Sequence, residues 1–228
     1  MLFPIGDDQI KGGHFPLFSY GFIALNIVVF IYEMSLDPQA FNNLIYNFGA
    51  IPNELTSGGP WWPLFTSMFL HGDIMHLVGN MVFLWIFADN IEAVIGNVRF
   101  LIFYLLGGLA AHALHIFISP GSVVPTVGAS GAISAVMGAY LVMFPSSRIK
   151  VLFLSFFMRV PAFVFLGIWI LQQSISGTQS LQTATTESGG VAWWAHIGGF
   201  AAGILAGLIF TNRYRGPVLE SDLGDRYL

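Results

Sequence analysis

The stretch Gly128–Phe144, which reads GASGAISAVMGAYLVMF, decides how the rest of the chain must be arranged. It carries no charged residue, so the segment that begins at Ser130 is expected to lie in a membrane. A second apolar stretch contains a lone histidine, His196, within the string AHIGG. Lipid-embedded helices tolerate polar groups mainly where function requires them. A serine and a histidine on two such spans suggest hydrolysis inside the bilayer.

The composition also places the chain in the membrane class. Of its 228 residues, 55% are hydrophobic and 9% are charged, and the mean hydropathy is +0.73. Soluble domains carry about 25% charged residues, so this chain has too little polar surface to cover a water-soluble globule. The absence of cysteine excludes disulfides and thiolate chemistry. A net charge of −4, with only eight Lys and Arg, argues against nucleic acid as a partner. No cofactor is expected.

Apolar segments separated by Gly, Pro and polar residues predict an all-α polytopic membrane protein, a six-helix transmembrane bundle. The start of the fifth span is ambiguous, because the apolar run already begins at Val151 and is interrupted before Pro161. We expect one membrane domain, residues 18–210, between an N-terminal segment 1–17 and a polar tail 211–228. The predicted spans are Phe18–Leu36, Asp73–Asn90, Arg99–Ile118, Ser130–Phe144, Pro161–Gln172 and Val191–Phe210.

The basic residues orient these spans. They all fall in the N-terminal segment, the second connection, the fourth connection or the tail: Lys11, Arg99, Arg148, Lys150, Arg159, Arg213, Arg215 and Arg226. Cytoplasmic loops of membrane proteins are enriched in Lys and Arg. Both termini are therefore predicted to be cytoplasmic, and the first, third and fifth connections are predicted to face outward.

Two outward connections differ in composition. The first, Asp37–Gly72, is only moderately polar, and Trp61 and Trp62 suit the membrane–water interface. Part of it is expected to lie in the outer leaflet. The fifth, Gln173–Gly190, is rich in Gln, Ser, Thr and Gly, and it is expected to be mobile. No internal repeat is evident, which counts against a transporter built from duplicated halves.

Helix geometry places several polar side chains at one depth. Ser130 lies about 21 Å from the inner end of its span, at roughly 1.5 Å per residue, in a hydrocarbon core about 30 Å thick. His196 lies equally far from the inner end of the sixth span, which runs the same way. The second span adds His76 and Asn80, which share one helix face at i and i+4. These four side chains are therefore predicted to cluster in the outer half of the membrane.

Small residues predict that the fourth and sixth spans touch. Gly199, Gly203 and Gly207 repeat every four residues, and such a ridge lets helix backbones approach closely. Gly131 belongs to a matching small face on the fourth span. His196 projects from the same side as Gly199. A hydrogen bond between serine and histidine across two helices requires this close approach.

Each of these signals also has a purely structural interpretation. In a chain this rich in Gly and Ser, the string GxSG arises by chance with a probability of about one in five. Its small residues alone could serve helix packing. His196, or His76 together with Asn80, could simply link helices through hydrogen bonds. The conjunction of motif, depth, helix face and orientation favours a functional site.

The other polar residues of the spans have simpler interpretations. His71 is predicted to be interfacial. His112 and His115, at i and i+3 on the third span, lack a carboxylate or a third ligand for a metal, so no metal site is expected. Glu92 and Arg99 flank the second connection and are expected to stabilise it.

Together, these strings resemble the rhomboid intramembrane serine proteases of the bacterial six-span type, over about Trp61 to Phe210. The matching strings are His76-Leu77-Val78-Gly79-Asn80, Glu92-Ala93-Val94-Ile95-Gly96, Gly128-Ala129-Ser130-Gly131 and Ala195-His196-Ile197-Gly198-Gly199 with Gly203. The resemblance implies a serine endopeptidase of the bacterial plasma membrane that needs no cofactor. It would cut transmembrane protein substrates at a site open to the outer side of the lipid bilayer.

The resemblance also implies roles for individual residues. Ser130 would be the nucleophile and His196 its general base and then general acid, a dyad without a carboxylate. Asn80, His76 and the backbone N–H of Ser130 would form the oxyanion hole. The structural residues of the site would be Gly128, Gly131, Gly199 and Gly203.

The chain departs from the family pattern at two positions. Family members often carry Trp-Arg in the first connection, where this chain has Trp62-Pro63. Some members also place a tyrosine one turn after the nucleophile, where it stacks on the catalytic histidine. Here that position is Ser134. His196 is therefore expected to be held differently, beside a roomier substrate cavity.

Three other functions compete with proteolysis. A catalytically inactive rhomboid-like protein would bind and route membrane clients, but this chain keeps both Ser130 and His196. A small transporter or channel would need polar groups that continue towards the cytoplasmic side, yet the deeper parts of the fourth and sixth spans are apolar. A purely structural set of polar residues leaves their matched depths unexplained.

Overall fold

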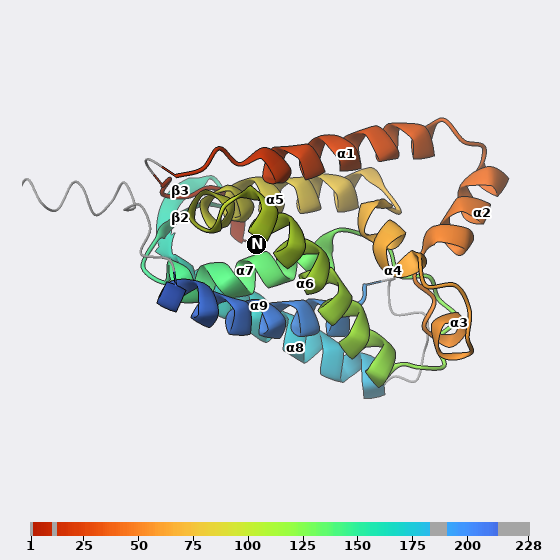
Figure 1. Ribbon diagram of the computed structural model, residues 1–228. Helices are drawn as coiled ribbons and strands as arrows, with labels where there is room; N and C mark the ends of the chain where they lie inside the picture. Colours follow the sequence, from red (N-terminus) through yellow and green to blue (C-terminus); the bar gives the residue numbers. More distant parts are fainter. Residues whose placement is uncertain (1, 11–12, 183–190, 214–228) are drawn as a thin grey trace, which may run out of the picture.

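The computed structural model describes residues 2–10, 13–182 and 191–213, and six long helices dominate this part of the chain (Figure 1). Four of the six are long and apolar enough to cross a membrane, namely α1, α5, α6 and α9. The predicted all-α polytopic membrane bundle is confirmed, and each predicted span has its helix. The bounds are α1 Leu17–Met34, α5 Ile74–Ile95, α6 Asn97–Ile118, α7 Ser130–Met143, α8 Ala162–Gln182 and α9 Trp193–Arg213.

The shortest of the six helices, α7, lies inside the bundle. It packs against α5, α6, α8 and α9, and every residue from Ala132 to Tyr140 is buried. Because protein surrounds it, α7 does not need the full length of a lipid-exposed span. Its Ser130 end stops short of the ends of α6 and α8 (Figure 1).

Helices α7 and α9 touch along their backbones. A β-carbon added to Gly199 would overlap the carbonyl oxygen of Gly131, and one added to Gly203 would overlap that of Ala135. Only glycine fits such an approach. The predicted contact between the fourth and sixth spans is therefore present, and it depends on the glycine ridge of α9.

Short helices fill the connection between α1 and α5, at the right of Figure 1. They are α2 Pro38–Phe48, α3 Pro52–Thr56 and α4 Pro63–Thr66, followed by the 3₁₀ turn η1, Ser67–Phe69. Asp37 caps α2, since its carboxylate accepts hydrogen bonds from the backbone of Gln39 and Ala40, both at 2.9 Å. Trp61 and Trp62 are exposed, and Pro63 occupies the first turn of α4.

The opposite end of the bundle carries a small antiparallel sheet, and we call it the sheet end. The strands are β1 Leu2–Gly6, β2 Arg148–Phe153 and β3 Phe156–Pro161, in the order β1-β2-β3. The apolar run that obscured the start of the fifth span is thus a β-hairpin. The N-terminal segment, predicted as a cytoplasmic stretch outside the membrane domain, supplies the third strand.

Buried polar contacts tie the N-terminal segment to the sheet end of α7. The Asp7 carboxylate accepts hydrogen bonds from the Tyr140 hydroxyl at 2.5 Å and from the Asn90 amide at 2.7 Å. The pKa of Asp7 is raised to about 7, mainly by burial; the hydrogen bond from Tyr140 opposes the rise, and the neighbouring carboxyls of Asp89 and Asp8 add to it.

The prediction for the fifth connection was wrong over residues 173–182, which continue α8 to Gln182. Their Ser and Thr hydroxyls bond back to carbonyls of the same helix, as Ser174 does to Ile170 at 2.9 Å and Ser180 to Gly177 at 2.7 Å. Polar residues lower hydropathy without breaking a helix. Residues 183–190 of that prediction lie outside the described part of the chain.

Glu92 has another role than the predicted one. It is fully buried in α5, and its carboxylate accepts hydrogen bonds from the backbone N–H of Phe18 at 2.8 Å and of Ser19 at 2.7 Å. Both donors belong to the first turn of α1, so Glu92 caps that helix. The second connection itself is the single residue Gly96, whose φ of 83° suits glycine.

Candidate active site

Ser130 stands at the first position of α7, directly after a sharp turn of the chain. Gly128 adopts a φ of 117°, which favours glycine, and its N–H donates to the carbonyl of Ser67 at 2.8 Å. The first N–H groups of a helix have no partner within the helix. They therefore face the space in front of Ser130, together with the positive end of the helix dipole.

The hydroxyl of Ser130 meets the imidazole of His196. Their Oγ and Nε2 atoms lie 2.8 Å apart. His196 belongs to the first turn of α9, just before Gly199, which packs on the backbone of α7. The two residues that the sequence singled out are thus in hydrogen-bond contact.

A third residue holds the other side of the imidazole. The Gln173 side-chain carbonyl, Oε1, lies 2.7 Å from Nδ1 of His196, and Gln173 is only 5% exposed. A carbonyl oxygen can only accept, so Nδ1 carries the proton. Nε2 is then free to accept from the hydroxyl of Ser130. Gln173 was missed from the sequence, because the predicted fifth span ended one residue before it.

Two tryptophans lie against the imidazole ring of His196. The ring of Trp169 lies 5.9 Å from it with planes 37° apart, and Trp193 meets it edge-on at 6.2 Å. Ser134, at the position of the family's tyrosine, is buried and donates to the carbonyl of Ser130 at 2.6 Å. Trp169 and Trp193 thus provide the aromatic contacts that Ser134 cannot.

The polar residues of α5 lie beside the turn that leads into α7. A β-carbon on Gly128 would lie 2.6 Å from Nε2 of His76 and 3.4 Å from Nδ2 of Asn80, so both side chains pack on the backbone of this glycine. The Asn80 amide also meets Nε2 of His71 at 2.9 Å. His71 is fully buried in the protein, and its predicted position at the membrane interface stays a prediction.

A small pocket opens beside Ser130. Its lining includes Met68, His112, Val127, Gly128 and Ala195. Ser134 does not belong to this lining. The roomier substrate cavity expected beside His196 stays a prediction.

The chain is thus a helical bundle of the membrane class in which a serine at a helix N-terminus is hydrogen-bonded to a histidine of another helix. The family model described as "Rhomboid domain" matches residues 58–213 of this chain. The chain belongs to the rhomboid family, as the sequence strings predicted, and it is an integral membrane protein.

Curated relatives agree with this membership. The chain is 37% identical over 133 residues to "Rhomboid protease GluP" of Bacillus subtilis, covering 58% of this chain and 26% of that protein. It is 30% identical over 139 residues to the human "Presenilin-associated rhomboid-like protein, mitochondrial", covering 60% and 35%. The match to "RHOMBOID-like protein 12, mitochondrial" of Arabidopsis thaliana is 29% over 202 residues, covering 82% and 56%. The matches thus span about a quarter to a half of these relatives.

Proposed function

We propose that this rhomboid protein is an intramembrane serine endopeptidase that hydrolyses peptide bonds in or near transmembrane segments of other membrane proteins. The observation that carries the proposal is the 2.8 Å contact between Ser130 and His196, with Gln173 bonded to the far side of the imidazole. The name of the Bacillus relative, a rhomboid protease, points the same way.

The proposed chemistry uses the proton positions that Gln173 favours. The Ser130 hydroxyl gives its proton to Nε2 of His196 while Oγ attacks the substrate carbonyl. The resulting imidazolium then protonates the leaving nitrogen. A water molecule, activated by the same imidazole, hydrolyses the acyl enzyme and regenerates Ser130. Gln173 does not touch the substrate; it is a positioning residue that keeps Nε2 unprotonated.

The oxyanion would form at the N-terminus of α7. The free N–H groups there, including that of Ser130, are proposed to stabilise the developing charge. The Asn80 amide is the proposed side-chain donor, and its contact with His71 fixes its direction. His76, which packs on Gly128, is proposed to contribute to the same hole.

The proposed surroundings are the plasma membrane of a bacterium, with both termini cytoplasmic and the site open to the outer side. Substrate helices would have to unwind locally, because a helix satisfies its own peptide groups and shields them from attack. Helix-breaking substrate sequences should therefore be preferred. The apolar, buried interior of α7 beyond Ser134 supports hydrolysis over transport.

The proposal is tested with purified protein in detergent and a fluorophosphonate probe. The wild type is expected to form a covalent adduct, which the Ser130→Ala and His196→Ala variants lose. Ser146→Ala, an exposed serine at the sheet end, should label like the wild type. An adduct that survives Ser130→Ala would contradict the proposal, and no adduct in a folded wild type would favour a client-binding protein.

A further inference from the structure

The β2–β3 hairpin ends in an apolar tip that covers nothing in the described chain. Its turn and the adjoining strand ends are strongly exposed: Leu154 by 74%, Phe156 by 72% and Phe157 by 77%. Nearer the bundle, Ile149 and Val151 are fully buried. The hairpin is thus anchored at its base and apolar at its free end.

The turn itself retains a large apolar residue at a costly position. Leu154 has a φ of 54°, and it is the only residue other than glycine with a positive φ in the described chain. Gly, Asn or Asp would occupy this conformation at lower cost. A leucine that is both strained and exposed indicates that its side chain has a task outside the fold.

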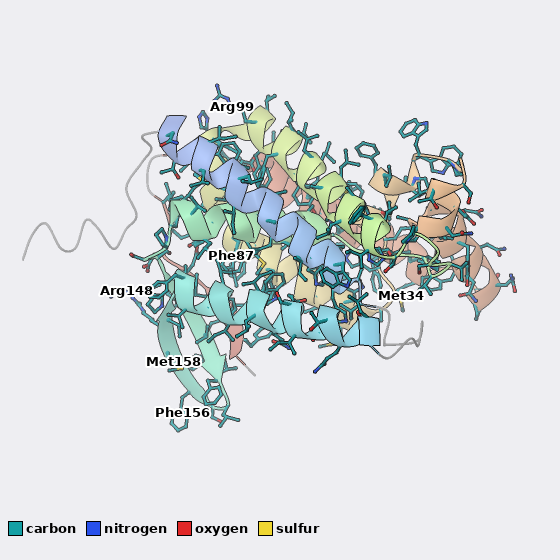
Figure 2. The ribbon with its side chains drawn as sticks, turned by 90° about the horizontal axis from the view of Figure 1, so that it is seen from below. Met34, Phe87, Arg99, Arg148, Phe156 and Met158 are labelled. Carbon is teal, nitrogen blue, oxygen red and sulfur yellow. The ribbon has the colours of Figure 1, made fainter. Side chains whose placement is uncertain are left out.

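The direction of the hairpin places this tip among lipids. Figure 2 shows the hairpin leaving the sheet end of the bundle sideways, beside the flank of α8, with Arg148 near its base, Met158 partway along it and Phe156 at its free end. Helix α8 exposes large apolar side chains of its own, including Ile168 and Leu171. A sideways projection from a membrane bundle enters the surrounding lipid at the level of the helix ends.

Besides its apolar tip, the hairpin carries exposed basic side chains nearer its base. Lys150 lies directly opposite Arg159 in the antiparallel register, so their side chains share one face of the sheet, and Arg148 follows on that face. All three are exposed, and none forms an ion pair with any residue that the structure describes. Like charges in opposite positions destabilise a hairpin unless an anion lies between them.

We propose that the hairpin binds the inner leaflet of the membrane: its tip, Phe153–Met158, enters the acyl region, and Lys150 and Arg159 hold the phosphates of anionic lipids. The positions of the two groups along the hairpin fit this binding, because the basic pair lies nearer the bundle and the apolar tip lies farther out in the lipid. The same arrangement of basic and apolar groups is typical of interfacial membrane anchors. This surface is remote from Ser130 and does not depend on the proposed hydrolysis.

The chain contains no cysteine, so single labels can be placed without removing any native residue. A nitroxide on Ser155→Cys at the tip is compared with one on Ser146→Cys, an exposed polar position before the hairpin. In nanodiscs with anionic lipid, the tip label should be reached by oxygen and shielded from a water-soluble nickel reagent, while the control shows the reverse. Equal nickel access at the two positions would overturn the proposal.

The basic pair is tested by lipid enrichment. In mixed nanodiscs, the wild type should collect fluorescent anionic lipid near a label on Ser155→Cys, and Lys150→Gln with Arg159→Gln should lose it, about fivefold for each charge removed. Asn53→Gln at the opposite end serves as the matched control. Enrichment that survives the double substitution would contradict the proposal. Tip shielding that requires two protein copies in one disc would instead show a protein–protein contact and would also overturn it.

Discussion

Two Ser–His hydrogen bonds occur in the described part of the chain, and their surroundings differ. Ser130 and His196 lie 2.8 Å apart, and Ser67 and His112 lie 3.1 Å apart. In the second pair Ser67 is fully buried and Nδ1 of His112 has no partner among the described residues. In the first, Gln173 bonds Nδ1 and the serine begins a helix. A short Ser–His distance is therefore not sufficient; its surroundings decide what the pair can do.

The second pair has a packing role that the structure makes plain. Ser67 belongs to η1 and His112 to α6, so their hydrogen bond joins the connection between α1 and α5 to the bundle. The carbonyl of Ser67 also accepts the N–H of Gly128. The pair thus supports the turn before Ser130 from behind.

The largest expected difference is between the two serines. Ser130→Ala should lower peptide cleavage by at least about 10⁴-fold, because the nucleophile is lost. Ser67→Ala should keep labelling by a fluorophosphonate probe and cost about 1–3 kcal/mol of stability, since it leaves His112 without its partner. Cleavage assays and thermal unfolding measure the two effects. Loss of labelling in a folded Ser67→Ala protein would break the comparison.

The next largest effect is expected at Asn80, whose side-chain amide packs on Gly128 in the turn before Ser130. Asn80→Ala should lower kcat by about 10²–10³-fold with little change in KM, the usual cost of one oxyanion-hole donor. Asn80→Asp, which removes a donor and adds negative charge, should be at least as impaired. An unchanged kcat in either variant would assign Asn80 to packing alone.

Removing the acceptor for Nδ1 should make the first pair resemble the second. Gln173→Leu is expected to lower kcat by about 10- to 100-fold, as for other groups that orient a histidine. Gln173→Glu keeps an acceptor and should retain more activity, with its pH profile displaced to higher pH because a carboxylate stabilises the imidazolium. Gln172→Leu, the exposed neighbour on α8, is the matched control. Identical pH profiles for all variants would show a merely structural role.

The smallest effect belongs to the far end of α7, where Tyr140 bonds Asp7. The pKa of Asp7 is about 7 in the folded protein and 3.8 when exposed. The folded state therefore binds more protons between these values, and the N-terminal strand should be held best below pH 4 and less firmly as the pH rises to 7.

Hydrogen exchange of the β1 amides, corrected for the intrinsic rate at each pH, measures this change. Asp7→Asn should abolish the dependence, whereas Asp37→Asn on α2 should leave it intact. A wild-type strand equally protected at pH 4 and pH 7 would contradict the prediction. Neither Ser–His pair should respond to Asp7→Asn.

The helical bundle and the contact between Ser130 and His196 could be predicted because both depend on regular features of the sequence, namely long apolar segments and evenly spaced glycines. Hydropathy located the spans, and the glycine spacing of α9 predicted the contact that brings His196 to Ser130. Gln173 escaped because a run of Gln, Ser and Thr lowers hydropathy, yet its hydroxyls bond within the helix. The hairpin escaped because its apolar tip reads like a span. The alternation over Arg148–Val151 was the available signal for a strand.

Glu92 has a consequence for how the protein is made. The first turn of α1 depends on a carboxylate that lies 73 residues further along the chain. When a ribosome delivers α1 to the membrane, its leading amides have no acceptor until α5 emerges. The N-terminal cap of α1 is therefore expected to form only after α5 has been synthesised.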